Sequence, residues 1–295
     1  MDRAEDGTVT VHFQKSSVRG EKQPSATCDF LVGADGLKSP VRAALLGAAL
    51  PRYTGKTIYR GLCEVDALIS DGYTVSLCGN EHGNFICYPI SEGMRKDGKT
   101  HCNWGFNCDR PEPAGVEDWT SSASISDIAE ELAAMDQNVF GGLTPLQMAQ
   151  KTKKIIGWAL FDRDPLASFD FGTVTLLGDA AHPLLPYGSQ GATQAIMDAE
   201  ALGEAYRQAM ALGTGIRGAV KIYSDLRCEI SGKVVIANRD MGPTAVLREV
   251  DRKCKDMSKD EKQKWIDEHG RSLFHELIQN YRKSMPKSVS CVAEK

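Results

Sequence analysis

The stretch LLGDAAHPLLPYGSQGATQAIMDA, residues 176–199, contains a strand end, a turn and a helix start in 24 residues. The apolar run TVTLLG, residues 173–178, predicts a buried strand. The Pro- and Gly-rich segment HPLLPYGSQG predicts a loop, and a helix is expected from about Gly191. Apolar residues at helical spacing beyond that point predict a buried helix face, made of Ala192, Ala195, Ile196, Ala199 and Leu202.

A second strand and helix are predicted near the start of the chain. TVTVHF, residues 8–13, alternates in the manner of a β-hairpin arm, and DFLVGA, residues 29–34, is a short apolar run that favours a buried strand. The next segment has the residues of a helix start and stop, with Ser39 as the N-cap, Pro40 in the first helical position and Gly47 at the end.

The pattern of predicted strands and helices divides the chain into four segments. Short β-prone runs between residues 52 and 110 predict an antiparallel or mixed sheet, and KIIGWALFDRDP predicts a strand that returns toward the first domain. From about residue 216 the chain is charged and helix-prone. We therefore expect a mixed α/β protein with segments at 1–50, 51–157, 158–212 and 213–295.

Composition excludes several classes of protein. The formal net charge is -4, which gives no basic surface for nucleic acid, and no apolar run approaches the ~20 residues of a transmembrane segment. Nine cysteines without C-x-x-C pairs indicate free thiols in a reducing compartment. We expect a soluble cytoplasmic protein, with an organelle as the alternative if the true N-terminus lies upstream. Six dispersed histidines predict no metal site.

The motif GTGIRG, residues 213–218, matches the G-x-G-x-x-G pattern of a dinucleotide-binding turn. Such a turn must follow a strand and open a helix, so that phosphate oxygens meet free backbone N–H groups. Here the motif follows a predicted helix and precedes another. We interpret its glycines as a helix end and a connector between two helices.

Two longer stretches resemble the motifs of the single-component FAD-dependent aromatic hydroxylases. LVGADGLKSPVR, residues 31–42, is similar to the DG motif of that family, and residues 176–199 are similar to its GD motif. YRGLCEV, YPISEG, WALFDRDPL and ANRDMGP also resemble the family, in particular its salicylate-hydroxylase and phenazine-hydroxylase branches. The resemblance covers about residues 8–285.

This resemblance implies a glutathione-reductase-type Rossmann-like domain for FAD and NAD(P)H, into which a β-sheet substrate domain is inserted, with C-terminal helices. The family's opening strand–G-x-G-x-x-G–helix unit has no counterpart before residue 31. We therefore expect an N-terminally incomplete Rossmann-like domain, and a purified chain that is colourless or weakly yellow.

The two motifs also imply which residues bind the cofactor. By resemblance, the Asp179 carboxylate binds the ribityl hydroxyls of FAD; the alternative is that it only caps a turn. Asp35 would serve the FAD pyrophosphate region and NAD(P)H, and Arg42 would anchor a phosphate unless it is a solvated arginine. The helix near Gly191 would direct its positive end toward the flavin. The residues expected to bind the cofactor are Gly33, Asp35, Gly36, Arg42, Gly178, Asp179, Ala180, Pro186, Gly188, Gly191 and Ala192.

Three residues are candidates for a catalytic or substrate-binding role. His182 either takes part in the reaction or shapes the turn, and the second reading is preferred. Arg60 either faces the cofactor, binds an acidic substrate or is an ordinary sheet residue. Tyr187 either borders the flavin or substrate or has no such role.

The resemblance implies a monooxygenase that hydroxylates an aromatic or polycyclic small molecule with FAD, NAD(P)H and O2, in the manner of EC 1.14.13 enzymes. The alternatives are a flavin epoxidase on the same scaffold, or a truncated, non-catalytic chain that binds no FAD.

Overall fold

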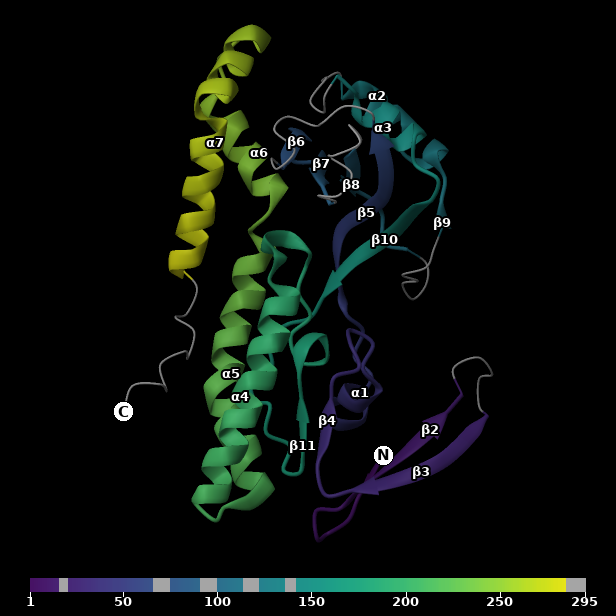
Figure 1. The fold of residues 1–295 in the computed structure, drawn as a ribbon, viewed down its shortest axis with the longest axis vertical. Helices are drawn as coiled ribbons and strands as arrows, with labels where there is room; N and C mark the ends of the chain where they lie inside the picture. The colour runs from purple at the N-terminus through teal and green to yellow at the C-terminus, as the bar shows by residue number, and fades with distance from the viewer. Residues whose placement is uncertain (16–20, 66–74, 91–99, 114–121, 136–141, 285–295) are drawn as a thin grey trace. The chain divides into compact units, whose positions relative to one another are not determined.

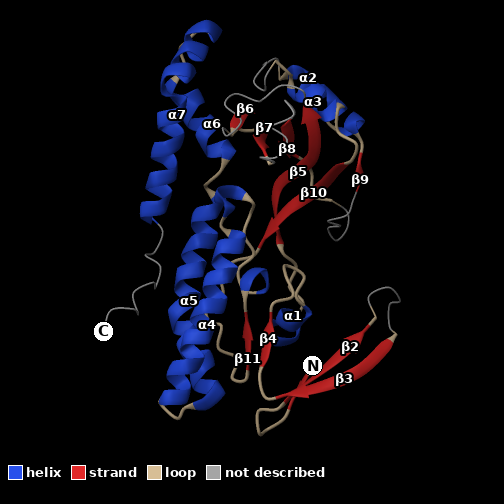
Figure 2. Cartoon of the chain, viewed as in Figure 1, coloured by secondary structure: helices blue, strands red, loops and turns tan. Residues whose placement is uncertain are grey.

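The computed structural model describes residues 1–15, 21–65, 75–90, 100–113, 122–135 and 142–284. They form two compact units, whose helices and strands are drawn in Figures 1 and 2. Unit 1 comprises Met1–Arg52, Asp162–Asp240 and the chain from Asn280, and unit 2 comprises Tyr53–Phe161 and Met241–Gln279. Of the helices in the described ranges, none combines the length and hydropathy that a membrane-spanning segment requires.

The described part of unit 1 contains two small sheets and three complete α-helices. One sheet is the antiparallel set β1 (Asp2–Arg3), β2 (Val9–Gln14) and β3 (Lys22–Cys28); the other is the parallel pair β4 (Leu31–Gly33) and β11 (Val174–Leu176). The α-helices are α1 (Pro40–Leu46), α4 (Gly191–Ala211) and α5 (Gly215–Arg239), and two 3-10 turns are η3 (Gly178–Ala180) and η4 (Tyr187–Ser189).

The predicted strands and first helix of unit 1 are confirmed. β4 and β11 pair in parallel with Gly33 opposite Leu176, and all three residues of β11 are buried. The Ser39 hydroxyl accepts a hydrogen bond from the Arg42 amide, Pro40 begins α1, and Gly47 follows its last residue. The polar N-cap and the proline therefore fix the start of α1 as expected.

The predicted buried face of α4 is wrong for most of its members. Ile196 is 69% exposed, and Ala192 and Ala199 are also exposed. The helix instead buries four other residues, two of them polar: Gln194, Asp198, Ala205 and Ala209. Arg227 of α5 donates hydrogen bonds to both polar side chains, and these contacts offset the desolvation cost of burying them.

The interpretation of GTGIRG as a connector between helices is confirmed. α4 ends at Ala211 and α5 begins at Gly215, and Gly213 has a φ of 68° at the turn between them. The amide of Thr214 donates to the carbonyl of Ala209 and so closes the last turn of α4. The motif follows a helix and not a strand, and it cannot act as a dinucleotide-binding turn.

Unit 2 is built on a six-stranded sheet with the order β6-β7-β8-β5-β10-β9. Its strands are β5 (Arg52–Val65), β6 (Ser76–Gly79), β7 (Gly83–Pro89), β8 (Thr100–Asp109), β9 (Ser122–Ala123) and β10 (Ile155–Asp162). Its helices are η2 (Ile125–Asp127), α2 (Ala129–Ala134), α3 (Pro145–Gln150), α6 (Pro243–Lys253) and α7 (Lys259–Ser284). α6 contacts β6 and β7, whereas α5 packs on α4 in unit 1. The C-terminal helices that we predicted as one region, 213–295, therefore belong to two units.

The core of unit 2 lies on one face of β8. Trp104 and Phe106 are fully buried and pack with Leu132 of α2 and Met148 of α3. The two aromatic residues of the segment NWGF, residues 103–106, thus belong to the core. The alternate side chains Asn103 and Asn107 lie on the opposite face, since successive residues of a strand point to opposite sides.

Candidate functional site

Gly178 shapes the turn that follows β11. Its φ is 59°, and an added Cβ would lie 3.2 Å from the Cβ of Ala195. The amides of Ala181 and His182 both donate to the Gly178 carbonyl, at 2.8 and 2.9 Å. Because the left-handed backbone and the close approach of α4 both disfavour a side chain, glycine is required here.

Arg42 of α1 holds the same turn. Its side chain is 8% exposed, and Nη1 donates to the carbonyls of Ala180 and Ala181 at 2.9 and 2.8 Å. The alternative of a solvated helix arginine is therefore wrong. The expectation that Arg42 also meets a phosphate stays a prediction.

A buried ionic cluster fixes the turn to α4 and α5. The fully buried Asp198 carboxylate accepts hydrogen bonds from the Gly178 amide at 3.0 Å, from His182 Nε2 at 2.5 Å and from Arg227 Nε at 2.7 Å. The second Arg227 nitrogen, Nη2, donates to Gln194 Oε1 at 2.7 Å. The contact between His182 and Asp198 is one that a histidine shaping the turn would make.

Asp198 has a lowered pKa in this cluster. Burial acts to raise the pKa, but the hydrogen bonds and charges of His182, the Gly178 amide and Arg227 outweigh it. Sequence reasoning missed this cluster. The available signal was the pair Gln194 and Asp198, four residues apart in an alanine-rich helix, with Arg227 on the next helix.

Asp179 follows Gly178 in the turn and lies at the protein surface. Asp179 is exposed, whereas its neighbours Gly178 and Ala180 are buried. Desolvation by neighbouring protein atoms raises the pKa of Asp179, against the His182 charge and a hydrogen bond with the Leu184 backbone. Asp179 is thus an exposed residue whose carboxyl group has a raised pKa.

The loop before α4 is held by α5. Asn238 Nδ2 donates to the Tyr187 carbonyl at 2.5 Å, and the Leu185 amide donates to Asn238 Oδ1 at 2.8 Å. The loop then turns through Gly188, with a φ of 72°, and Ser189, with a φ of 54°. Ser189 is the one non-glycine residue with positive φ among the described residues, and such backbone strain is often found at ligand-binding turns.

The start of α4 presents uncapped backbone. Among the residues that the structure describes, no side chain caps its N-terminus, and an added Cβ at Gly191 would meet no atom within 4 Å. The free N–H groups of such a helix end favour an anionic or electron-rich ligand. The open backbone at Gly191, the exposed Asp179 and the Gly178 turn are thus the groups here that a cofactor could contact.

Asp35 has a local partner in the DG stretch. Its carboxylate accepts hydrogen bonds from Ser39 Oγ at 2.5 Å and from the Val41 amide at 3.1 Å, so it stabilises the start of α1. Its predicted contact with the cofactor stays a prediction. Gly33 and Ala180 are buried, Tyr187 is 7% exposed, Gly36 is half-buried, and Pro186, Gly188 and Ala192 are exposed.

Arg60 lies in unit 2 on the polar face of the sheet. Its Nη2 donates to Asn103 Oδ1 at 3.2 Å, and its guanidinium carbon lies 5.5 Å from the ring centre of Trp158. On the same face Asn107 Nδ2 donates to Asn84 Oδ1, while the buried Asn107 Oδ1 has no hydrogen-bond partner among the described residues. This face of the sheet therefore carries the oriented guanidinium of Arg60. It also carries the Asn107 side-chain oxygen, an acceptor without a hydrogen-bond partner among the described residues.

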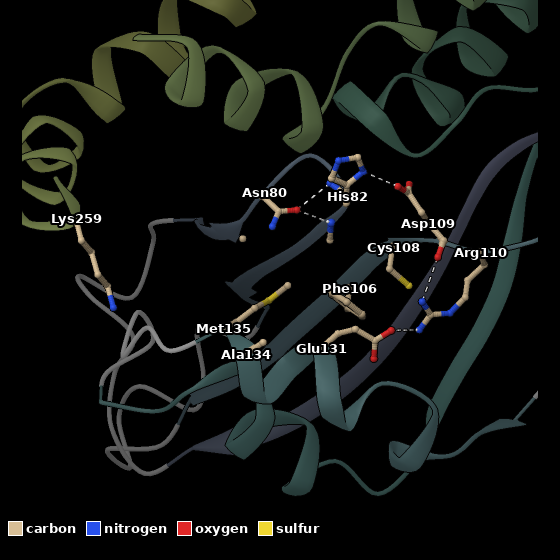
Figure 3. A pocket seen from close by; sticks show the side chains of 12 residues that line it. Asn80, His82, Phe106, Cys108, Asp109, Arg110, Glu131, Ala134, Met135 and Lys259 are labelled. Atoms are coloured by element: carbon tan, nitrogen blue, oxygen red, sulfur yellow. Dashed lines mark hydrogen bonds and ion pairs between the residues drawn. The ribbon is translucent and has the colours of Figure 1, made fainter. Parts of the chain in front are cut away.

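A hollow of about 520 Å³ lies on the other side of β8, at the end of α2. Figure 3 shows the charged side chains around it. His82 Nδ1 and Asp109 are 2.8 Å apart, and Arg110 binds Glu131 at 2.6 Å. Since these groups already bind one another, we assign no ligand to this hollow.

Comparison with known proteins identifies the family. Residues 3–237 match the model of the FAD binding domain family. The chain is 31% identical over 252 residues to 6-methylsalicylate 1-monooxygenase atA of Aspergillus terreus, covering 79% of this chain and 53% of that protein. It is 32% identical over 240 residues to phenazine 1,6-dicarboxylic acid hydroxylase PhzS of Lysobacter antibioticus, covering 79% and 56%.

A solved structure shows the same fold. Klebsiella pneumoniae HpxO complexed with FAD and uric acid superposes with a TM-score of 0.67 at 24% identity, over 97% of this chain and 65% of that one. The chain thus belongs to the FAD binding domain family, and the curated relatives it matches are aromatic hydroxylases and monooxygenases. It spans about half the length of those relatives.

Proposed function

We propose that the chain functions in an FAD-dependent monooxygenase that hydroxylates a small aromatic molecule with NAD(P)H and O2. The observation that carries this proposal is the Gly178 turn, which packs against Ala195 of α4, contains the exposed Asp179 and precedes the uncapped start of that helix. The family match and the names of the relatives support it. No observation on the described residues favours the epoxidase or the non-catalytic alternative.

FAD would supply the redox chemistry, by activating O2 with electrons from NAD(P)H. The protein's part is to bind and orient it. Asp179 would accept hydrogen bonds from ribityl hydroxyls, and the free N–H groups of α4 would favour the electron-rich edge of the ring. The cluster of Asp198, His182 and Arg227 keeps this backbone rigid.

Asp179→Asn is expected to weaken FAD binding roughly tenfold, because hydrogen bonds to a charged acceptor contribute about 1.5–3 kcal/mol. The measurement is quenching of FAD fluorescence on titration with the full chain. Asp225→Asn, an exposed aspartate on α5, is the matched control and should leave the affinity unchanged. Equal affinity of Asp179→Asn and wild type, or no saturable binding by wild type, would contradict the proposal.

We further infer that the substrate carries a carboxylate, bound by Arg60. The contacts with Asn103 and Trp158 orient the guanidinium, and a charged planar group of this kind suits a carboxylate. Among the described residues of unit 2, Arg60 forms no ion pair, so an anionic ligand would meet an uncompensated charge.

Arg60→Gln is expected to weaken binding of salicylate about tenfold while leaving salicylamide, its uncharged analogue, unaffected. Saturation-transfer NMR on the full chain measures both affinities. Arg248→Gln removes an exposed arginine of the same unit and serves as the control. A parallel loss for both ligands, or no loss for either, would count against a carboxylate contact at Arg60.

A further inference from the structure

Asn107 of β8 is a buried residue with one hydrogen-bonding atom left over. Its side chain is 2% exposed, and its Nδ2 donates to Asn84 Oδ1 at 3.2 Å. The fully buried Asn84 donates in turn from Nδ2 to Thr244 Oγ1 at 3.2 Å, so a helix and two strands hold the Asn107 amide in one orientation. These bonds use the Asn107 nitrogen and leave its oxygen without a donor among the described residues. A buried acceptor of this kind costs free energy unless a ligand or a water donates to it.

Gly105 leaves room on the sheet beside Asn107. Side chains at alternate positions of a strand share one face, so Gly105 and Asn107 lie on the same face of β8. The register places Gly105 opposite Arg60 of β5 and opposite Ile86 of β7. An added Cβ at Gly105 would lie 3.4 Å from Ile86 Cγ2 and 3.6 Å from Ile58 Cδ1, which are ordinary contact distances. The missing side chain therefore leaves space over Gly105 for a flat group that contacts both isoleucines.

The spacing of the polar groups on this face indicates the shape of such a ligand. Arg60 donates to Asn103 Oδ1, and Asn103 lies four residues before Asn107, which is roughly 13 Å along an extended strand. A benzene ring with two well-separated substituents and a hydrogen bond at each end spans a distance of this order. Two substituents on neighbouring carbons lie at one end of the ring and cannot reach both groups. The face therefore fits a ring whose second polar substituent is remote from its carboxylate.

We propose that Asn107 Oδ1 accepts a hydrogen bond from a hydroxyl or amino group on the substrate ring, meta or para to the carboxylate that Arg60 binds. This inference rests on the proposed function and narrows its substrate class to aromatic acids with that substitution pattern. A ring with such a donor satisfies the buried oxygen, whereas a ring without one leaves it unpaired. Asn107 is thus a residue that determines specificity, through the cost of a hydrogen bond left unmade.

Saturation-transfer NMR with matched pairs of aromatic acids tests the proposal on the full wild-type chain. We expect para-hydroxybenzoate to bind about fivefold more tightly than para-methylbenzoate, which has a similar size but no donor, or meta-hydroxybenzoate to exceed meta-methylbenzoate by the same factor. Salicylate should show no such advantage over ortho-methylbenzoate, because its hydroxyl lies beside the carboxylate. Equal affinities within both the meta and the para pair overturn the proposal.

Asn107→Leu removes the acceptor and keeps the approximate volume of the side chain. The preference for hydroxyl over methyl should disappear in this variant, and the affinity for the methyl compound serves as the internal reference for an intact site. Gln150→Leu, which replaces an exposed amide of α3 in the same unit, is the control and should keep the preference. A preference that persists in Asn107→Leu would mean that the donor meets another group, and it would overturn the assignment.

Gly105→Ala is a second variant that keeps the proposal testable if Asn107→Leu does not fold. Its added methyl group lies at contact distance from Ile86 and Ile58 and clashes with neither. It occupies the space assigned to the ring, so the affinity for all of these acids should fall at least about fivefold. Unchanged affinity would show that the ring does not lie over Gly105 and would overturn the proposal.

Failure of this inference differs from failure of the proposed function. If the acids bind in wild type and lose affinity in Arg60→Gln, but hydroxyl and methyl compounds bind equally, the carboxylate contact stands and the Asn107 contact is wrong. If none of the acids binds, the carboxylate contact and the Asn107 contact are both wrong.

Discussion

Replacing Asp198 with alanine is expected to lower the free energy of unfolding by roughly 3–5 kcal/mol, the loss typical of breaking a buried ion pair. The substitution leaves the Arg227 guanidinium, 2% exposed, without its charged partner. It also leaves the Gly178 amide and His182 Nε2 without the carboxylate to which both donate hydrogen bonds in the wild-type chain. Urea unfolding followed by circular dichroism measures the loss.

The double variant Asp198→Ala/Arg227→Met separates the ion pair from the remaining contacts. If the unpaired arginine causes most of the loss, the double variant should be more stable than Asp198→Ala alone. A loss below about 1 kcal/mol in Asp198→Ala would contradict the role of the cluster.

The same cluster predicts a pH dependence. The folded-state pKa of Asp198 is lowered, so its contribution to stability is present above the unfolded pKa of about 3.9 and is lost as the pH falls through the folded value. Asp198→Asn should therefore be less stable than wild type at neutral pH and should lose less stability on acidification. An unchanged acid profile in Asp198→Asn would argue that the carboxylate is not ionised in the folded chain.

Replacing Gly33 with valine is expected to lower the free energy of unfolding by about 3 kcal/mol, at the upper end for overpacked cores. An added Cβ at Gly33 would lie 2.8 Å from Leu176 Cδ2 and 2.8 Å from Val41 Cγ1. These atoms belong to β11 and α1, so the glycine allows the strand and the helix that carry both motifs to pack closely. Thermal unfolding measures the change.

Gly203→Ala is the matched control, because an added Cβ there meets no atom within 4 Å. In the interior of α4 this substitution should stabilise the chain by roughly 0.5–1 kcal/mol. A Gly33→Val variant as stable as wild type would show that the close packing of β4, α1 and β11 is not required. Gly33 would then be left with only its predicted role in cofactor binding.

Local signals in the sequence predicted the elements that carry the site. The ends of α1 followed from Ser39, Pro40 and Gly47, since capping depends on neighbouring residues alone. The position of GTGIRG after a helix was enough to reject it as a phosphate-binding turn. The DG and GD motifs led to the family that the comparison identifies.

Contacts between distant segments were not predictable in the same way. The apolar pattern predicts Ile196 on the buried face of α4, but Ile196 is exposed. The face that contains Asp198 is buried instead, because Arg227, 29 residues further along the chain, donates to that carboxylate. The sequence leaves Arg42 as either a phosphate ligand or a solvated residue, because its actual partners, the carbonyls of Ala180 and Ala181, lie 138 and 139 residues further along the chain. The periodicity of apolar residues indicates the average polarity of a helix face. It does not indicate which distant residue hydrogen-bonds a polar side chain on that face.

Hydrogen exchange of the full chain with and without FAD tests most directly whether the Gly178 turn and the start of α4 hold the cofactor. We predict that FAD slows exchange of the backbone amides of residues 178–193, while amides of α2 in unit 2 exchange at their original rate. Slowed exchange elsewhere in unit 1 with none at residues 178–193, or no change at saturating FAD, would contradict the assignment of this turn to the flavin.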